Sequence, residues 1–178
     1  MSRVTLFLTL TLLVFAGCGP SKDKRVIRIA DMEKRLFSPE SFSFNKESAD
    51  SLVDMYVKYI EKYPKDTLSP SFLFKAANLK MNSDDAAGAI SFFDRYLNEY
   101  PEAPKTSMCF FFKGFIYENM MRDLDQAREI YLQFIEKYPN DEFVDDARMS
   151  LMNLGKTPEM LIREFEQKLR ADSARYAD

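Results

Sequence analysis

A repeated segment limits the fold of this chain more than any other feature. Three twelve-residue stretches align without gaps, and each ends in Tyr-Pro; they cover residues 53–64, 90–101 and 128–139. The tyrosines of these pairs are Tyr63, Tyr100 and Tyr138, so the interval is 37 and then 38 residues. An interval of this length is typical of arrays in which small supersecondary units stack on their neighbours.

Each repeated segment carries aromatic residues at helical spacing. Counting back from the tyrosine of Tyr-Pro, an aromatic residue recurs four and seven residues earlier, and a small or apolar residue eleven earlier. These spacings place the side chains on one face of a helix. The proline then ends the helix, because it cannot continue the hydrogen-bond ladder. We therefore expect six aromatic residues in the core: Tyr56, Tyr59, Phe93, Tyr96, Tyr131 and Phe134.

Helix start and stop signals extend this pattern along the chain. Ser69-Pro70 resembles an N-cap followed by a proline at the first helical position, and Asp123 to Gln126 resembles a capping box. Gly155 would end one helix and Thr157-Pro158 would begin the last one. We expect an all-α chain of about seven to eight helices at 46–63, 70–82, 84–100, 104–121, 124–138, 142–154 and 158–171, with a weaker helix at 28–37.

The motif that runs from Gly114 to Pro139 resembles the tetratricopeptide repeat (TPR). Gly114 and Tyr117 match the first helix of that repeat, and Ala127, Tyr131 and Phe134 match the second. The resemblance implies a right-handed superhelix of antiparallel helix pairs over residues 46–155. Residues 156–178 would form a capping helix and a tail, with the stripe of Leu161, Phe165 and Leu169 covering the end of the array.

The Tyr-Pro-rich form of the repeat is similar to that of outer-membrane-assembly lipoproteins and of Tol-associated periplasmic proteins. The first residues fit such a location. Arg3 precedes an uncharged apolar stretch of twelve residues, Val4 to Phe15, which is short for a membrane span of about 20 residues. Small residues then precede Cys18, which resembles a bacterial lipoprotein signal.

The resemblance to lipoproteins implies a set of expectations for the N-terminus. Residues 1–17 would be a signal peptide, and Cys18 would carry acyl chains such as palmitate. Residues 18–45 would form a tether and a possible short helix, with the basic cluster at 22–25 solvated rather than bound to lipid headgroups. Gly19 in place of Asp favours the outer membrane over the inner one, and we expect the chain to face the periplasm there; the alternative is a signal anchor with an incidental cysteine.

Composition argues against catalysis. The chain has no histidine and two cysteines, so a histidine-assisted nucleophile is excluded and a zinc site is not expected. With Cys18 acylated, Cys109 would be an inert core thiol without a disulfide partner. The net charge of −3, without a basic patch, argues against nucleic acid as a partner. We expect no enzyme, no cofactor and no metal.

TPR arrays bind peptides or helices on a concave face, and the resemblance assigns positions on that face. The terminal-carboxylate clamp of some TPR proteins is not expected, because Phe74 and Met149 stand where its lysines would be. Whether Phe111 and Phe115 line the groove or the core stays open, and one of Phe110 to Phe112 should face outward. The expected groove residues are Phe74, Asn78, Met81, Asn82, Met108, Phe111, Phe115, Glu118, Asn119, Met149 and Asn153.

Two functions follow from these expectations. The first is a non-catalytic, membrane-tethered scaffold that binds protein partners of the outer membrane or periplasm, in a complex for envelope assembly or maintenance. The second is a lipoprotein that binds a small ligand such as a glycan, a peptide or a peptidoglycan fragment. An open apolar groove favours the first, and a closed pocket lined by aromatic residues favours the second.

Overall fold

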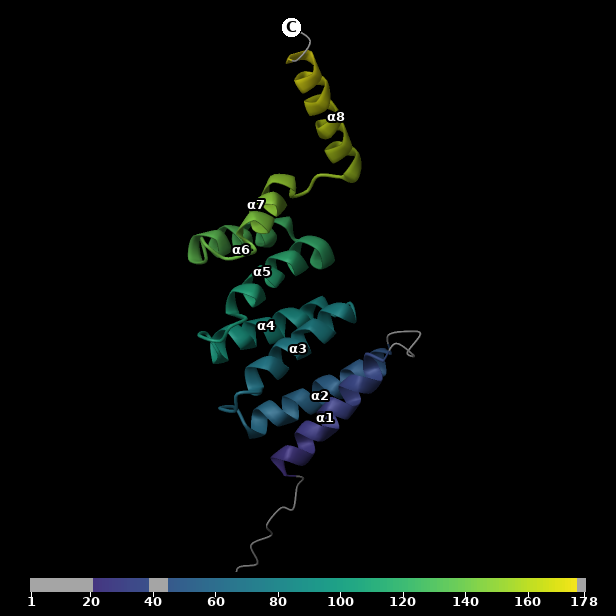
Figure 1. Cartoon of the computed structure of the whole chain (residues 1–178), viewed down its shortest axis with the longest axis vertical. Coiled ribbons are helices and arrows are strands. Elements are labelled where there is room, and N and C mark those ends of the chain that lie inside the picture. Colours follow the sequence, from purple (N-terminus) through teal and green to yellow (C-terminus); the bar gives the residue numbers. More distant parts are fainter. Residues whose placement is uncertain (1–20, 39–44, 176–178) are drawn as a thin grey trace, which may run out of the picture.

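The computed structural model describes residues 21–38 and 45–175, with side chains up to residue 170. Within these residues the chain is all-α, as predicted (Figure 1). A single π-helical turn, η1, extends α5. The elements are α1 (Lys22–Leu36), α2 (Lys46–Lys62), α3 (Ser69–Asn82), α4 (Ala86–Glu99), α5 (Thr106–Ile116), η1 (Tyr117–Met121), α6 (Leu124–Lys137), α7 (Val144–Asn153) and α8 (Pro158–Arg175).

Helices α1 to α7 stack in chain order, each packed against the next (Figure 1). The Tyr-Pro segments form the ends of α2, α4 and α6, and α3, α5 and α7 follow them after short turns. This is the TPR-like arrangement that the resemblance implies, in which each unit contacts only its neighbours.

The same turn follows each Tyr-Pro helix. The N–H groups of Tyr63, Tyr100 and Tyr138 donate to the carbonyl oxygen four residues earlier and end the helices. The carbonyl oxygen of each tyrosine then accepts from the N–H three residues later, at a distance of 3.0 or 3.1 Å. The turns therefore orient every following helix in the same way.

The start of α3 differs from the sequence-based expectation. Leu68, not Ser69, occupies the N-cap position, and Pro70 stands one residue further into the helix. The Ser69 hydroxyl is buried and donates to the carbonyl oxygen of Tyr63 at 2.6 Å, so it ties α3 back to α2. Thr106 repeats this contact with the carbonyl oxygen of Tyr100 at 3.2 Å. The hydroxyl therefore closes the turn instead of capping the helix.

Three further helices begin two residues later than expected, at 86, 106 and 144. Asp84 adopts a positive φ of 59°, outside the helical region, and Asp85 caps α4 by accepting from the N–H of Gly88 at 2.9 Å. The Asp123 cap was predicted correctly, since its carboxylate accepts from the N–H of Gln126 at 3.0 Å.

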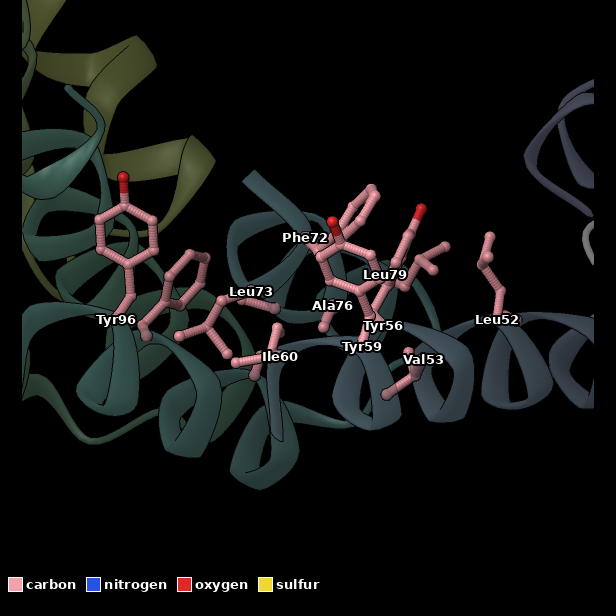
Figure 2. Packing of buried hydrophobic residues seen from close by; sticks show 14 of the residues in the cluster. Leu52, Val53, Tyr56, Tyr59, Ile60, Phe72, Leu73, Ala76, Leu79 and Tyr96 are labelled. Atoms are coloured by element: carbon pink, nitrogen blue, oxygen red, sulfur yellow. The ribbon is translucent and has the colours of Figure 1, made fainter. Parts of the chain in front are cut away.

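The repeated aromatic residues form the core, as predicted. All six are at most 1% exposed. Figure 2 shows Tyr56, Tyr59 and Ile60 of α2 facing Phe72, Leu73 and Ala76 of α3. The ring of Phe72 stacks on Tyr56 at 5.1 Å and meets Tyr59 edge-on at 4.9 Å. Burial of such large rings is the main stabilising contribution in this stack.

The expected weak helix at 28–37 is longer than predicted and belongs to the array. Helix α1 begins at Lys22, so the basic cluster at 22–25 is helical and is not a free tether. Ile29 and Leu36 are buried in the core beside α2. Lys22 forms an ion pair with Asp66 in the turn before α3, and this contact lowers the pKa of Asp66.

The last helix does not cover the end of the array, contrary to expectation. Helix α8 projects away from α7 (Figure 1), and Phe165 and Leu169 are 63% and 51% exposed. Gly155, with a φ of +80°, turns the chain between the two helices. An ion pair of 2.8 Å joins Lys156 to Glu164 across this turn. The apolar stripe is therefore present on α8, but it does not form the expected cap on α7.

The close approach of α5 to α6 at Gly114 predicts a measurable effect on stability. A Cβ atom on Gly114 would lie 2.7 Å from the ring of Tyr131. Gly114→Ala should therefore destabilise the fold by about 1–3 kcal/mol, although alanine is the better helix former by about 1 kcal/mol. Urea unfolding followed by circular dichroism would measure this.

The control for this substitution is Ser91→Ala, at an exposed position within α4. It should change stability by no more than about 0.5 kcal/mol. A Gly114→Ala protein more stable than the wild type would contradict the close packing of α5 on α6.

Candidate protein-binding face

Two hollows lie along α3, α5 and α7. The N-terminal hollow has a volume of about 380 Å³, and the central hollow about 520 Å³. The N-terminal hollow is lined by Glu33, Phe37, Tyr56, Phe74, Lys75, Asn78, Leu79 and Asn82. The central hollow is lined by Met81, Phe111, Phe112, Phe115, Glu118, Phe143, Asp146, Met149, Ser150 and Asn153.

A polar cluster forms one side of the N-terminal hollow. Glu33 of α1 accepts from the Tyr56 hydroxyl at 2.6 Å and from the Lys75 ammonium group at 2.7 Å. Burial raises the pKa of Tyr56, so its hydroxyl stays protonated and remains a donor. Phe37 also lines this hollow, where it is 60% exposed and provides an apolar surface. The charges of Glu33 and Lys75 offset each other, so this hollow has little net charge.

The central hollow combines an apolar floor with an acidic edge. Phe111 and Phe143 stack at 4.9 Å and form part of the floor. Phe115 and Met149 are 40% and 59% exposed, on α5 and α7 respectively. Lys and Arg side chains are absent from the lining residues of this hollow, which include Glu118 and Asp146.

The π-helical turn positions Glu118. The N–H of Asp123 donates to the carbonyl oxygen of Tyr117 at 2.9 Å across this widened turn, and Arg122 follows it in a left-handed conformation. Glu118 accepts from the hydroxyl of the buried Tyr131 at 2.8 Å. Single π turns occur often at functional sites, and here the turn holds a carboxylate at the edge of the hollow. No helix-breaking residue in the sequence marked this turn.

The structure distributes the expected groove residues over more than one hollow. Phe74, Asn78 and Asn82 line the N-terminal hollow, and Asn119 lines a third one beside α8. Met108 lines neither of the two main hollows. The central hollow contains the others: Met81, Phe111, Phe115, Glu118, Met149 and Asn153. The sequence did not point to Glu33 and Phe37, because α1 was expected to lie outside the repeats.

Phe111 and Phe115 have different roles, which the sequence left open. Phe111 is 8% exposed and contacts Tyr131 and Phe134 at 5.8 and 5.7 Å, so it belongs to the core. Phe115, one helical turn later, is exposed.

The expectation that one residue of Phe110 to Phe112 faces outward was wrong. All three are buried or half-buried, because α5 is covered by α4 on one side and by α6 on the other. Phe110 packs edge-on against Tyr138 at 6.2 Å, and Phe112 lies between Phe74 and Phe143.

Cys109, the cysteine within the described residues, is enclosed in the fold. The side chain of Cys109 is fully buried, and burial raises the pKa of its thiol to about 12. A thiol in this state has almost no thiolate at neutral pH and does not react readily. In residues 21–38 and 45–175 no cluster of three or more His, Cys, Asp or Glu residues is placed to hold a metal ion.

Comparison with known families identifies the array. The sequence matches the YfiO family, described as outer membrane lipoproteins, over residues 30–173. The chain belongs to this family. The match extends from α1 into α8 and includes both hollows, and it confirms the predicted resemblance to TPR lipoproteins of the outer-membrane-assembly type. No curated protein matches the sequence.

The family description indicates a location at the outer membrane. None of the described helices is long and apolar enough to cross a membrane. The predicted signal peptide and Cys18 lie outside the described residues and before the family match. Acylation of Cys18 therefore remains a prediction from the sequence.

Phe111 and Phe115, both on α5, allow a direct test of the division between core and surface. Phe111→Ala should destabilise the fold by about 3–5 kcal/mol, since it removes a buried ring. Phe115→Ala should cost no more than about 1 kcal/mol because this ring is already partly in water. Denaturant unfolding of both variants would measure the difference. Equal losses would show that Phe115 is as important to the core as Phe111.

Proposed function

We propose that this chain is a non-catalytic, membrane-tethered scaffold and a subunit of a complex that assembles or maintains the outer membrane. Its partner is a protein that binds to the central hollow. The observation that carries this proposal is the exposed apolar surface of Phe115 and Met149 beside Glu118 and Asp146. Exposed apolar groups gathered in a hollow typically mark a protein-binding site.

The composition of the central hollow defines the partner segment. Its apolar floor fits the apolar face of a helix or of an extended segment. Its acidic edge favours Lys or Arg beside the apolar anchor, because opposite charges increase the association rate and the specificity. The partner segment is therefore amphipathic and basic.

The N-terminal hollow supports a second function, the binding of a small ligand. Its volume of about 380 Å³ is in the usual range for small-molecule sites. Phe37 and Phe74 could stack on a ligand, while Glu33, Lys75 and Asn78 could form hydrogen bonds to it. A glycan, a peptide or a peptidoglycan fragment would suit this mixture of groups.

The tether is the acylated Cys18, on the interpretation that residues 1–17 are a signal peptide. Cys18→Ala should abolish incorporation of labelled palmitate and release the chain from membranes washed free of protein contacts, because the acyl chains are the only part that this proposal inserts into the bilayer. Membrane fractionation and metabolic labelling would measure both effects. Retention of the unlabelled variant in washed outer membranes would contradict the tether.

The protein-binding proposal is tested in native envelopes. The lipidated chain is cross-linked, gently solubilised and purified, and its partners are identified by mass spectrometry. Phe115→Asp with Met149→Asp should weaken capture of a stoichiometric partner at least about 30-fold, as expected for an interface hot spot of about 2 kcal/mol or more.

Leu132→Asp is the matched control for this experiment. Leu132 is 55% exposed on α6 and lines neither main hollow, so its substitution should leave capture unchanged. Equal loss in the control would show that the hollow is not the site. Absence of any protein partner, with good recovery of the chain itself, would favour the small-ligand function.

A further inference from the structure

Thioethers are the accessible sulfur groups of the described array. Cys109, the cysteine of residues 21–38 and 45–175, is fully buried, and burial raises the pKa of its thiol to about 12. Within the same residues four methionine side chains are exposed: Met121 at 45%, Met149 at 59%, Met152 at 67% and Met160 at 47%. Oxidation follows exposure, so an oxidant in the surrounding water reaches these thioethers before it reaches the thiol.

Met149 differs from the other exposed methionines in its surroundings. It lines the central hollow, whose apolar floor includes Phe111 and Phe143. Met152, three residues later on α7, is slightly more exposed but lines neither main hollow. The two side chains therefore form a natural pair for comparison, because they share a helix and an exposure but not a site.

We propose that Met149 is a site of reversible oxidation that regulates protein binding at the central hollow. The inference rests on the proposed function, since it concerns the same partner site. The oxidant is a peroxide: the sulfur loses two electrons and bonds to one peroxide oxygen, the O–O bond breaks, and the other oxygen leaves as water. Methionine sulfoxide reductase reverses the step, as two thiols give up their hydrogen atoms, form a disulfide and release the oxygen as water.

Oxidation changes the hollow because the sulfoxide oxygen is a polar acceptor. The ionised carboxylates of Glu118 and Asp146 are also acceptors and cannot donate to it. The lining residues include no Lys or Arg, and the hydroxyl of Ser150 already bonds to Tyr131. This leaves the amide of Asn153 as the side-chain donor among the lining residues. An apolar anchor that covers the sulfoxide must therefore displace water without replacing its hydrogen bonds, which weakens binding about tenfold or more.

The position of Met149 also determines which form of the chain is sensitive. A partner segment seated in the central hollow covers the Met149 thioether, whereas Met152 stays in water. Oxidation therefore acts on the free chain. It prevents a new complex from forming and leaves an existing one intact.

The first test measures the modification on the chain alone. The mature chain, residues 18–178 with Cys18→Ser, is treated with limiting hydrogen peroxide, and oxidation is mapped by peptide fragmentation in a mass spectrometer. Met149 and Met152 should be oxidised several-fold faster than Met55, which is half-buried. Circular dichroism of the oxidised chain should be unchanged. Oxidation of Met149 no faster than that of Met55 would overturn the proposal.

The second test measures the effect on the partner. The lipidated chain is treated with peroxide, freed of oxidant and used to capture its partner from solubilised envelopes. Capture should fall about tenfold or more and should recover after treatment with methionine sulfoxide reductase. Each variant is compared with its own untreated sample. Met149→Leu should lose no capture on oxidation, whereas Met152→Leu should lose as much as the parent chain.

A polar substitution gives the same information without an oxidant. Met149→Gln places an uncharged polar group at the position of the sulfoxide and should weaken capture about tenfold. Met152→Gln is the matched control on α7 and should leave capture unchanged.

The outcomes separate this inference from the proposed function. Equal loss of capture on oxidation of the parent chain and of Met149→Leu would overturn the regulation alone, and so would a failure of the reductase to restore capture. If the untreated chain captures no partner, the partner site and its regulation are both overturned.

Discussion

Burial of the aromatic faces of α2, α4 and α6 is the interaction on which the rest of this structure depends. Tyr56, Phe93 and Tyr131 occupy equivalent positions on these helices and are completely buried. Rings of this size remove a large apolar area from water, and each of them contacts the helices that come before and after its own. Stability is therefore built up from contacts between neighbouring helices. In the described residues no disulfide reinforces them, since Cys109 is a free, buried thiol.

The turn after each Tyr-Pro helix converts this packing into a functional surface. Because the same hydrogen bonds orient α3, α5 and α7, the outer sides of these helices line up along one side of the stack. The two main hollows lie along this side of the stack. The first is lined by residues of α1, α2 and α3, and the second by residues of α3, α5 and α7, where Met149 is exposed.

Figure 1 shows α1 and α8 at opposite ends of the stack. In the proposed function the end with α1 lies at the membrane, because the anchor Cys18 precedes it, and the central hollow and α8 extend from it. The apolar stripe of α8 then stands at the end farthest from the membrane. Membrane attachment and protein binding would use different residues, so each can be disrupted without the other.

The sequence by itself determined the helical class, the repeat and the core. Aromatic residues spaced four and seven apart lie on one face of a helix, and that face must be buried. It also indicated most residues of the central hollow, since their positions follow from the repeat. Only the tertiary structure decided whether Phe111 or Phe115 faces water, because that depends on the helices on both sides of α5. Three further features could likewise not be predicted from the sequence: the π turn at Glu118, the packing of α1 in the array, and the projection of α8 away from α7. The first two depend on contacts between residues that share no local pattern, such as Tyr131 with Glu118 and Lys22 with Asp66.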